Sequence, residues 1–166
     1  MLIYHPAYDA YHCVFRLLLV VDSLRSVELT KLRILDFFLT FPAEIRTVKL
    51  PREHVEARKI AQQLVNEYRG PVNAKKTFQD MEQIYLAAVR ALAASNLLDK
   101  EKINAGIAVR TDAKIPPEMQ EKLNFARHRG GQIFEYILSG LGGIPTQGVD
   151  GLKHRTGLLE YRYDVI

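Results

Sequence analysis

The fold is decided by a stretch near the N-terminus, DAYHCVFRLLLVVDSL, which spans residues 9–24. Its apolar residues recur every three or four positions, and this period predicts a helix. The recurring positions are Ala10, Cys13, Val14, Leu17, Leu18, Val21 and Leu24. Phe15 and Val20 add apolar surface on the other sides, so the helix is apolar nearly all round. Such a helix lies either at the centre of a core or under a partner protein.

A second helix is expected directly after the first. Ser26 is a suitable N-cap, and a leucine and phenylalanine stripe runs from there through Leu39. Pro42 lies just past this stripe and ends the helix, because proline cannot continue one. The next sequence, EIRTVKLPREH at residues 44–54, reads either as a short strand or as a basic loop.

Two more helices follow in the central part of the chain. The third is expected from about Pro51 to Tyr68, since proline is favoured in a first turn and Gly70-Pro71 stops the pattern. The fourth begins at residues 77–80, Thr-Phe-Gln-Asp, which resemble a capping box. It continues to about Ser95.

Residues 103–111 alternate in polarity, which predicts one short strand or a small hairpin arm. Pro116-Pro117 then opens a fifth helix. Gly130 and Gly131 interrupt this helix, and each glycine costs about 1 kcal/mol relative to alanine in a helix interior. We therefore expect a break or hinge at the glycine pair, with a short helix resuming over residues 132–139.

These elements describe a chain that is mainly α with a few short β strands, an α+β class. At 166 residues, a single domain over residues 1–166 is expected. Residues 1–128 would form a helical body, and residues 129–166 a glycine-rich C-terminal segment that ends in a strand. Apolar helices followed by a short β element also suit a winged-helix-like arrangement.

The charge balance is mildly basic and uneven. The formal net charge is +4 and the sequence pI is about 9.2. Residues 16–76 hold 12 Lys/Arg against 7 Asp/Glu, whereas residues 110–166 hold 8 against 7. A polyanion would therefore bind the first half. The single cysteine, Cys13, excludes an internal disulfide and favours a cytoplasmic setting. No segment approaches the roughly 20 apolar residues of a membrane span, so no membrane contact is expected.

The spacing of reactive residues does not indicate catalysis. No H-E-x-x-H, C-x-x-C or Walker sequence occurs. His12 and Cys13 resemble a base and a nucleophile, but adjacent residues on a helix do not face each other. We expect no enzyme activity, no cofactor and no metal. A small enzyme would need His128, His154 and Arg155 to converge in one pocket.

Three basic segments are candidates for contact with phosphate or nucleic acid. One lies in residues 44–54, one precedes Gly130-Gly131, and one lies between Gly151 and Gly157. Glycines leave backbone N–H groups accessible, and basic side chains add charge. A hinge or a protein contact is the alternative for the second segment, and contact with an acidic protein surface is the alternative for the third. The candidate residues are Arg46, Lys49, Arg52, Arg127, Arg129, Lys153, His154 and Arg155.

Residues 158–165 alternate with the two-residue period of a strand that has one apolar and aromatic face. A strand at this position either closes the chain's own sheet or adds to the sheet edge of another chain. The predicted partner interface consists of this face and one residue of the first helix, namely Leu159, Tyr161, Tyr163, Val165 and Phe15.

Three stretches of the sequence, YHPAYDAYHCVFRLL, LRILDFFLTFP and GLKHRTGLLEYRY, together resemble a known family. They resemble the small middle-component proteins of bacterial three-component ABC systems, which include accessory subunits of Lamassu-type anti-phage defence. The resemblance implies a protein without an active site. Its expected partners are an SMC- or Rad50-like ABC ATPase that senses DNA, and an effector, often a nuclease, that is held silent until infection. The middle component would bind the ATPase head region and dock or restrain the effector.

The alternative function is that of a winged-helix DNA-binding regulator. It rests on the basic bias of residues 16–76 and on a wing over Ile103–Thr111. It implies salt-sensitive binding of duplex DNA by the isolated chain. The two functions overlap, since an adaptor held by its ATPase would also contact DNA through Arg46, Lys49 and Arg52.

Overall fold

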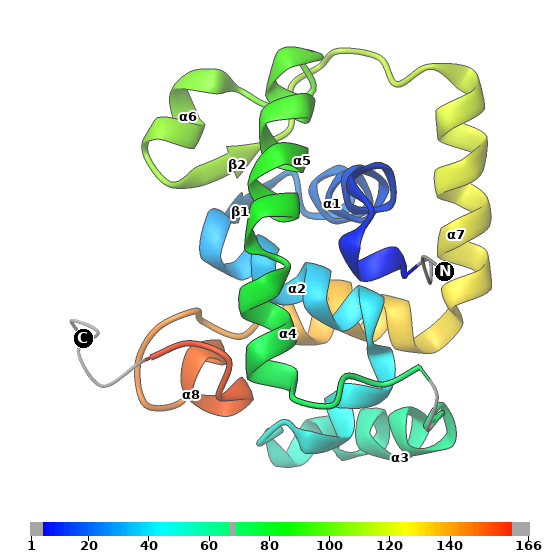
Figure 1. The fold of residues 1–166 in the computed structure, drawn as a ribbon, viewed down its shortest axis with the longest axis vertical. Helices are drawn as coiled ribbons and strands as arrows, with labels where there is room; N and C mark the ends of the chain where they lie inside the picture. The colour runs from blue at the N-terminus through cyan, green and yellow to red at the C-terminus, as the bar shows by residue number, and fades with distance from the viewer. Residues whose placement is uncertain (1–4, 67–68, 161–166) are drawn as a thin grey trace.

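The computed structural model describes residues 5–66 and 69–160. Within them the protein is mainly helical with a two-stranded antiparallel sheet, as the sequence predicts (Figure 1). The elements are η1 Pro6–Tyr8, α1 Ala10–Leu24, β1 Ser26–Glu28, α2 Leu29–Thr40, η2 Pro42–Thr47, η3 Arg52–His54, α3 Val55–Gln63, α4 Ala74–Asp80, α5 Glu82–Ala94, α6 Lys100–Asn104, β2 Ile107–Val109, α7 Pro117–Glu135, η4 Tyr136–Leu141 and α8 Leu152–Thr156. Helices η1 to η3 are 3₁₀ helices and η4 is a π-helix.

The first helix, α1, lies at the centre of the core. Every side chain from Leu17 to Val21 is at most 2% exposed. Asp9 caps the helix, because its carboxylate accepts a hydrogen bond of 3.1 Å from the backbone N–H of His12. The helix packs against α2 and α5. Of the two interpretations of an apolar helix, burial in the chain's own core is therefore confirmed.

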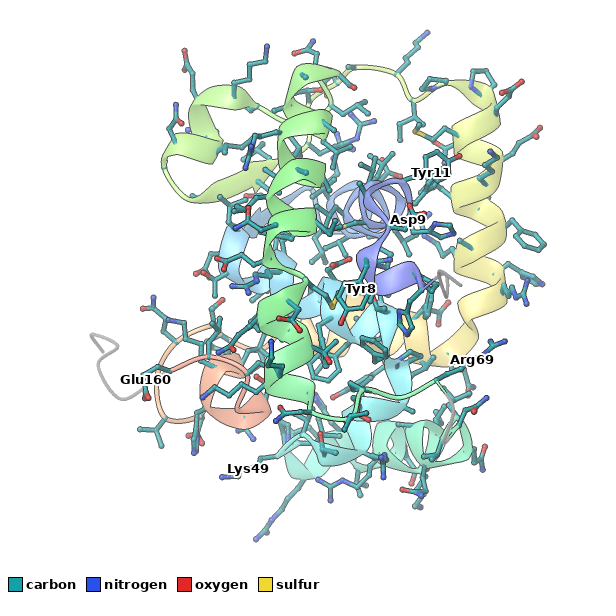
Figure 2. All side chains as sticks on the ribbon, in the orientation of Figure 1. Tyr8, Asp9, Tyr11, Lys49, Arg69 and Glu160 are labelled. Atoms are coloured by element: carbon teal, nitrogen blue, oxygen red, sulfur yellow. The ribbon has the colours of Figure 1, made fainter. Side chains whose placement is uncertain are left out.

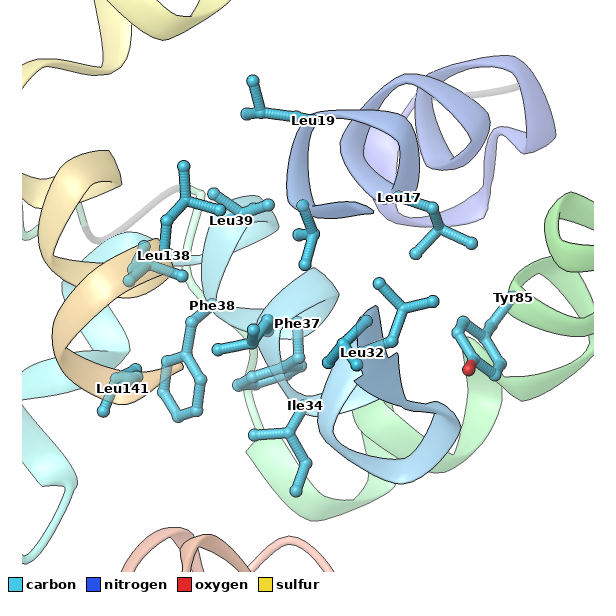
Figure 3. Close-up of a cluster of buried hydrophobic side chains, with 14 of the residues drawn as sticks. Leu17, Leu19, Leu32, Ile34, Phe37, Phe38, Leu39, Tyr85, Leu138 and Leu141 are labelled. Atoms are coloured by element: carbon cyan, nitrogen blue, oxygen red, sulfur yellow. The ribbon is translucent and has the colours of Figure 1, made fainter. Parts of the chain in front are cut away.

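The second helix, α2, carries buried side chains on most of its surface. Figure 3 shows Tyr85 of α5 on one side of the α2 residues, and Leu138 and Leu141 of η4 on the other. The Tyr85 hydroxyl donates a hydrogen bond of 2.6 Å to the carbonyl of Leu29, so the aromatic ring is both packed and fixed in direction. Residues from both ends of the sequence thus share one core.

A buried ion pair joins α1 to α2. The Arg16 Nε donates to Asp36 Oδ1 at 2.6 Å, and the two side chains are only 12% and 2% exposed. Arg16 Nη1 also donates to the carbonyl of Pro6 at 3.2 Å, which ties η1 to the same point. Burial raises the pKa of Asp36, and the neighbouring guanidinium opposes that shift. Burial likewise raises the pKa of the Cys13 thiol, which lies 3.6 Å from Asp36.

The sheet joins segments that are about eighty residues apart. Ser26 pairs with Val109, and Leu98 forms an antiparallel bridge with Arg110 on the other side of β2. The order across the sheet is therefore β1, β2 and then Leu98, with α6 in the loop between the last two. This order is compatible with the winged-helix-like arrangement.

Two boundaries near the second helix differ from the prediction. Ser26 is not a cap but the first residue of β1, because it pairs with Val109 of β2. Along β1 the side chain of Val27 is buried and those of its two neighbours are exposed, as the alternation of a strand requires. Residues 44–54 form neither a strand nor a plain loop. Ile45 and Val48 are three residues apart and both buried, and this spacing matches the three residues per turn of a 3₁₀ helix. Helix α3 then begins at Val55 rather than at Pro51 and ends at Gln63.

Two starts further along the chain were also predicted wrongly. Thr77 lies inside α4, and the true cap is Asn73, whose side chain accepts a hydrogen bond of 3.0 Å from the Lys76 N–H. Ile103 belongs to α6 and not to a strand. The reason is local, because Asp99 caps that helix: its carboxylate accepts hydrogen bonds from the backbone N–H groups of Glu101 and Lys102.

The predicted break at the glycine pair is confirmed. Gly131 has φ 59° and ψ −148°, values that non-glycine residues rarely adopt, and α7 kinks there. The helix resumes and passes into the π-helix η4. No strand occurs at residues 158–160, and the rest of the predicted terminal strand, 161–165, lies outside the described residues. No helix in the described part of the chain is long and apolar enough to cross a membrane.

The Asp36→Ala substitution tests whether the buried pair holds α1 and α2 together. It leaves the Arg16 guanidinium buried without its counter-charge, so we expect the free energy of unfolding to fall by about 3–5 kcal/mol in urea denaturation. The double substitution with Arg16→Met also removes the unpaired guanidinium, and it is expected to recover part of the lost free energy of unfolding. Glu56→Ala, which breaks an exposed pair with Lys59, serves as the control and should leave the midpoint nearly unchanged. A loss below about 1 kcal/mol for Asp36→Ala would contradict this role.

Candidate interaction surfaces

Two basic segments that are about a hundred residues apart lie side by side. The backbone N–H of Lys49 donates to the carbonyl of Arg155 at 3.0 Å, and Arg155 Nη1 donates to the carbonyl of Lys49 at 2.6 Å. Figure 2 shows Lys49 at the end of the molecule where α3 and α8 lie. We define the basic surface as the side chains of Arg46, Lys49, Arg52, Lys153, His154 and Arg155.

The C-terminal part of this surface is a short helix rather than a flexible loop. Gly157 adopts the left-handed conformation that ends α8, with φ 67°, and Leu152 buries its side chain completely. His154 Nδ1 is hydrogen-bonded to the carbonyl of Val149. The side chains of His154 and Arg155 are therefore each tied to backbone carbonyls.

The side chains of the basic surface divide into structural and exposed ones. Arg155 is only 18% exposed, and besides its bond to Lys49 it donates from Nε to the carbonyl of Asp150 at 2.6 Å. Arg46 lies 3.6 Å from Glu44. Lys49 and Arg52 are exposed and make no side-chain hydrogen bond or ion pair with the described residues. Arg155 thus builds the surface, while Lys49 and Arg52 are accessible to a ligand.

A cavity of about 450 Å³ adjoins the basic surface. Its wall includes His54, whose Nδ1 lies 3.1 Å from the Tyr136 hydroxyl of the π-helix. Burial raises the pKa of Tyr136 to about 12. The cavity is lined by Pro51, Glu53, His54, Ser139, Gly140, Gly143, Ile144, Pro145, Gln147, Asp150, Gly151 and Arg155. Pockets that bind small ligands commonly measure about 300–1,000 Å³, so the cavity is large enough to hold one.

The other predicted basic segment lies elsewhere. Arg127 contacts the end of α1, where its Nη2 donates to Ser23 Oγ at 2.9 Å. Arg129 is exposed on α7 and makes no hydrogen bond or ion pair with the described residues. No contact in the described structure joins either residue to α8. Of the three residues that an enzyme would need, His128 is on α7, whereas His154 and Arg155 are on α8.

The predicted partner interface is described only in part. Phe15 is half-buried and packs against Tyr11 at 4.9 Å between ring centres, with the Lys122 ammonium 6.0 Å from its ring. Leu159 is also half-buried against the core. Tyr161, Tyr163 and Val165 lie outside the described residues. Within the described residues, no group of three or more metal-binding side chains occurs.

Two charged clusters escaped the sequence reasoning. One is the Arg16–Asp36 pair, for which Asp36 gives a signal because it sits between Leu35 and Phe37 in an otherwise apolar run. The other gathers three arginines around Asp22 near the sheet. Its members are spread from residue 22 to residue 127, and no local pattern in the sequence connects them.

The fold and its surfaces define a mainly helical protein with a short antiparallel sheet and separate basic regions on its exterior. Residues 2–164 match the family model described as ABC-three component (ABC-3C) system Middle Component 5, so the chain belongs to this family. The match covers nearly the whole chain, and it confirms the resemblance to middle components. No curated protein and no solved structure matches the chain.

Substitution of Arg155 tests whether it builds the basic surface. Arg155→Lys keeps the positive charge, but one ammonium group cannot replace the fork that bonds two separate carbonyls. We therefore expect Arg155→Lys and Arg155→Ala to speed amide hydrogen exchange in α8 by similar factors. Arg52→Ala, which removes an exposed charge from the same surface, is the control and should leave that exchange unchanged. Unchanged amide exchange of α8 in Arg155→Ala would show that the bonds of Arg155 to the carbonyls of Lys49 and Asp150 are not needed to hold the helix.

Proposed function

We propose that this chain is a non-enzymatic adaptor subunit that bridges an SMC/Rad50-like ABC ATPase and an effector protein in a Lamassu-like anti-phage defence system. The observation that carries the proposal is membership of the middle-component family over residues 2–164. A middle component of a three-component system has two other components as its expected partners. The effector is proposed to be held inactive until the ATPase responds to foreign DNA.

A bridging role requires two surfaces that are accessible at the same time, and the fold supplies two such regions. The basic surface and its cavity lie with η2, η3 and α8, at the same end of the molecule as α3 (Figure 1). The sheet and α6 lie toward the opposite end. The residues that line the cavity and those of the sheet do not overlap, so two partners would bind without competing for the same residues.

The absence of catalysis remains a proposal, and the chemistry of the polar groups supports it. Cys13 is buried beside a carboxylate, and both features raise the pKa of its thiol and disfavour a nucleophilic thiolate. Arg155 uses its donors on backbone carbonyls. The burial of Cys13 and the backbone bonds of Arg155 thus support a structural role for these two residues.

Direct DNA binding by the isolated chain is the second candidate function, and the order of strands in the sheet favours it. The helix that precedes Leu98 is α5, which would be the DNA-reading helix. Its exposed positions include Leu86, Ala87 and Ala91, with Arg90 as their cation. A DNA-reading surface needs several cations for phosphate contacts. The adaptor role is therefore preferred, with DNA contact through Lys49 and Arg52 inside the complex.

Co-expression with the two genes that neighbour this one tests the adaptor proposal. We expect a stable complex with the ATPase component in size-exclusion chromatography. The isolated chain should bind duplex DNA weakly at about 50 mM salt. If the chain elutes separately from both co-expressed neighbours, the adaptor role is contradicted. Tight, salt-sensitive duplex binding by the isolated chain would favour the regulator instead.

A further inference from the structure

Three arginines from distant parts of the sequence surround one carboxylate at the end of α1. Asp22 lies 3.7 Å from Arg25 Nη1, 3.4 Å from Arg110 Nε and 3.8 Å from Arg127 Nη2. Arg25 precedes β1, Arg110 follows β2, and Arg127 comes from α7. The backbone N–H of Arg110 donates to the carbonyl of Arg25 at 2.8 Å, which fixes these two residues beside each other. We call Arg25, Arg110 and Arg127 the arginine cluster.

The hydrogen-bonding capacity of the arginine cluster is not filled. The distances to Asp22 are longer than the 2.7–2.9 Å that is typical of a charge-assisted hydrogen bond. The Nε atoms of Arg110 and Arg127 are buried and have no hydrogen-bond partner among the described residues. The Arg110 side chain is only 6% exposed. Buried donors of this kind normally have an acceptor, so the cluster lacks one.

The charge of the cluster is also not balanced. Asp22 is the carboxylate at its centre, and Asp112 lies 3.8 Å from Arg25 on the outer side. Three positive charges therefore face two negative ones, which leaves one positive charge. A single carboxylate would neutralise this excess, and its planar shape suits the fork of a guanidinium. A nucleic acid brings a row of negative charges, which Asp22 and Asp112 would repel.

The backbone at Arg25 supports a role for its side chain. Arg25 has φ 66° and follows the last turn of α1, a position where a positive φ strongly favours glycine. An arginine there accepts backbone strain that a glycine would avoid. The Arg25 side chain is about half exposed, so it is accessible at the mouth of the cluster.

We propose that the arginine cluster binds an aspartate or glutamate side chain of a protein partner. The partner carboxylate would pair with Arg25, the exposed member of the cluster, and its negative charge would offset the excess positive charge of the three arginines. The identity of the partner as a component of the same system rests on the proposed function. The cluster is separate from the basic surface, and it gives the sheet end of the molecule its own recognition chemistry.

Arg25→Gly is the informative variant, because it removes the accessible cation and also relieves the strained φ. We expect it to be at least as stable as the original chain in thermal unfolding and to bind the co-expressed partner about tenfold more weakly, the effect of one charge-assisted hydrogen bond. Arg129→Ala removes an exposed arginine from α7 outside the cluster, and it should leave the affinity unchanged. Equal affinities of Arg25→Gly and the original chain would overturn the proposal and leave the adaptor role intact.

A second measurement tests the cluster without any partner. The arginine Nε–H signals of the ¹⁵N-labelled chain are followed by NMR during titration with a hexaglutamate peptide, inorganic phosphate or duplex DNA. We expect the peptide to shift the Arg110 and Arg127 signals, and Arg25→Gly to weaken this response. Shifts with phosphate or DNA but not with the peptide would overturn the choice of a carboxylate. No shift with any of the three probes would overturn the site itself.

Discussion

The ion pair between Arg16 and Asp36 is the constraint on which the rest of the structure depends. It crosses from α1 to α2 inside the core, and Arg16 extends the same link to Pro6 of η1. A buried pair of this kind contributes less through net stability than through the cost of every arrangement that separates it. The apolar side chains of α1 would tolerate several rotations of the helix, because nearly all its faces are apolar. The contact between Arg16 and Asp36 is formed in the rotation that the structure shows.

The rotation of α1 about its axis determines where the arginine cluster and the basic surface lie. With Arg16 directed to Asp36, the C-terminal end of α1 places Asp22 between Arg25, Arg110 and Arg127. Helix α2 meanwhile leads into η2, whose end is bonded to α8 through Lys49 and Arg155. The packed core therefore connects the basic surface to the arginine cluster. For an adaptor, this packing would fix the distance and the angle between two bound partners.

Local chemistry explains what the sequence could predict. The apolar period of α1 and the glycine pair of α7 are short-range signals, and the structure confirms the helix and the break at Gly131. The failures involve partners that are far away in the sequence. The sequence around Ser26 is typical of a helix cap, but in the folded chain Ser26 pairs with Val109 of β2. Arg155 has the charge of a ligand-binding residue, but its guanidinium donates to the backbone carbonyl of Lys49. The arginine cluster needs three distant segments to meet, so only the folded chain shows it.

The most direct test of the bridging account is hydrogen–deuterium exchange of the chain, first alone, then with the ATPase component, then with both other components. The account predicts that the first partner slows exchange at one of the two regions, either residues 46–52 with α8, or the segments around Arg25 and Arg110. The second partner should then slow exchange at the other region, while α1 from Leu17 to Val21 stays unchanged. Protection of the same region by both partners, or of neither region, would contradict the claim that this chain joins them through separate surfaces.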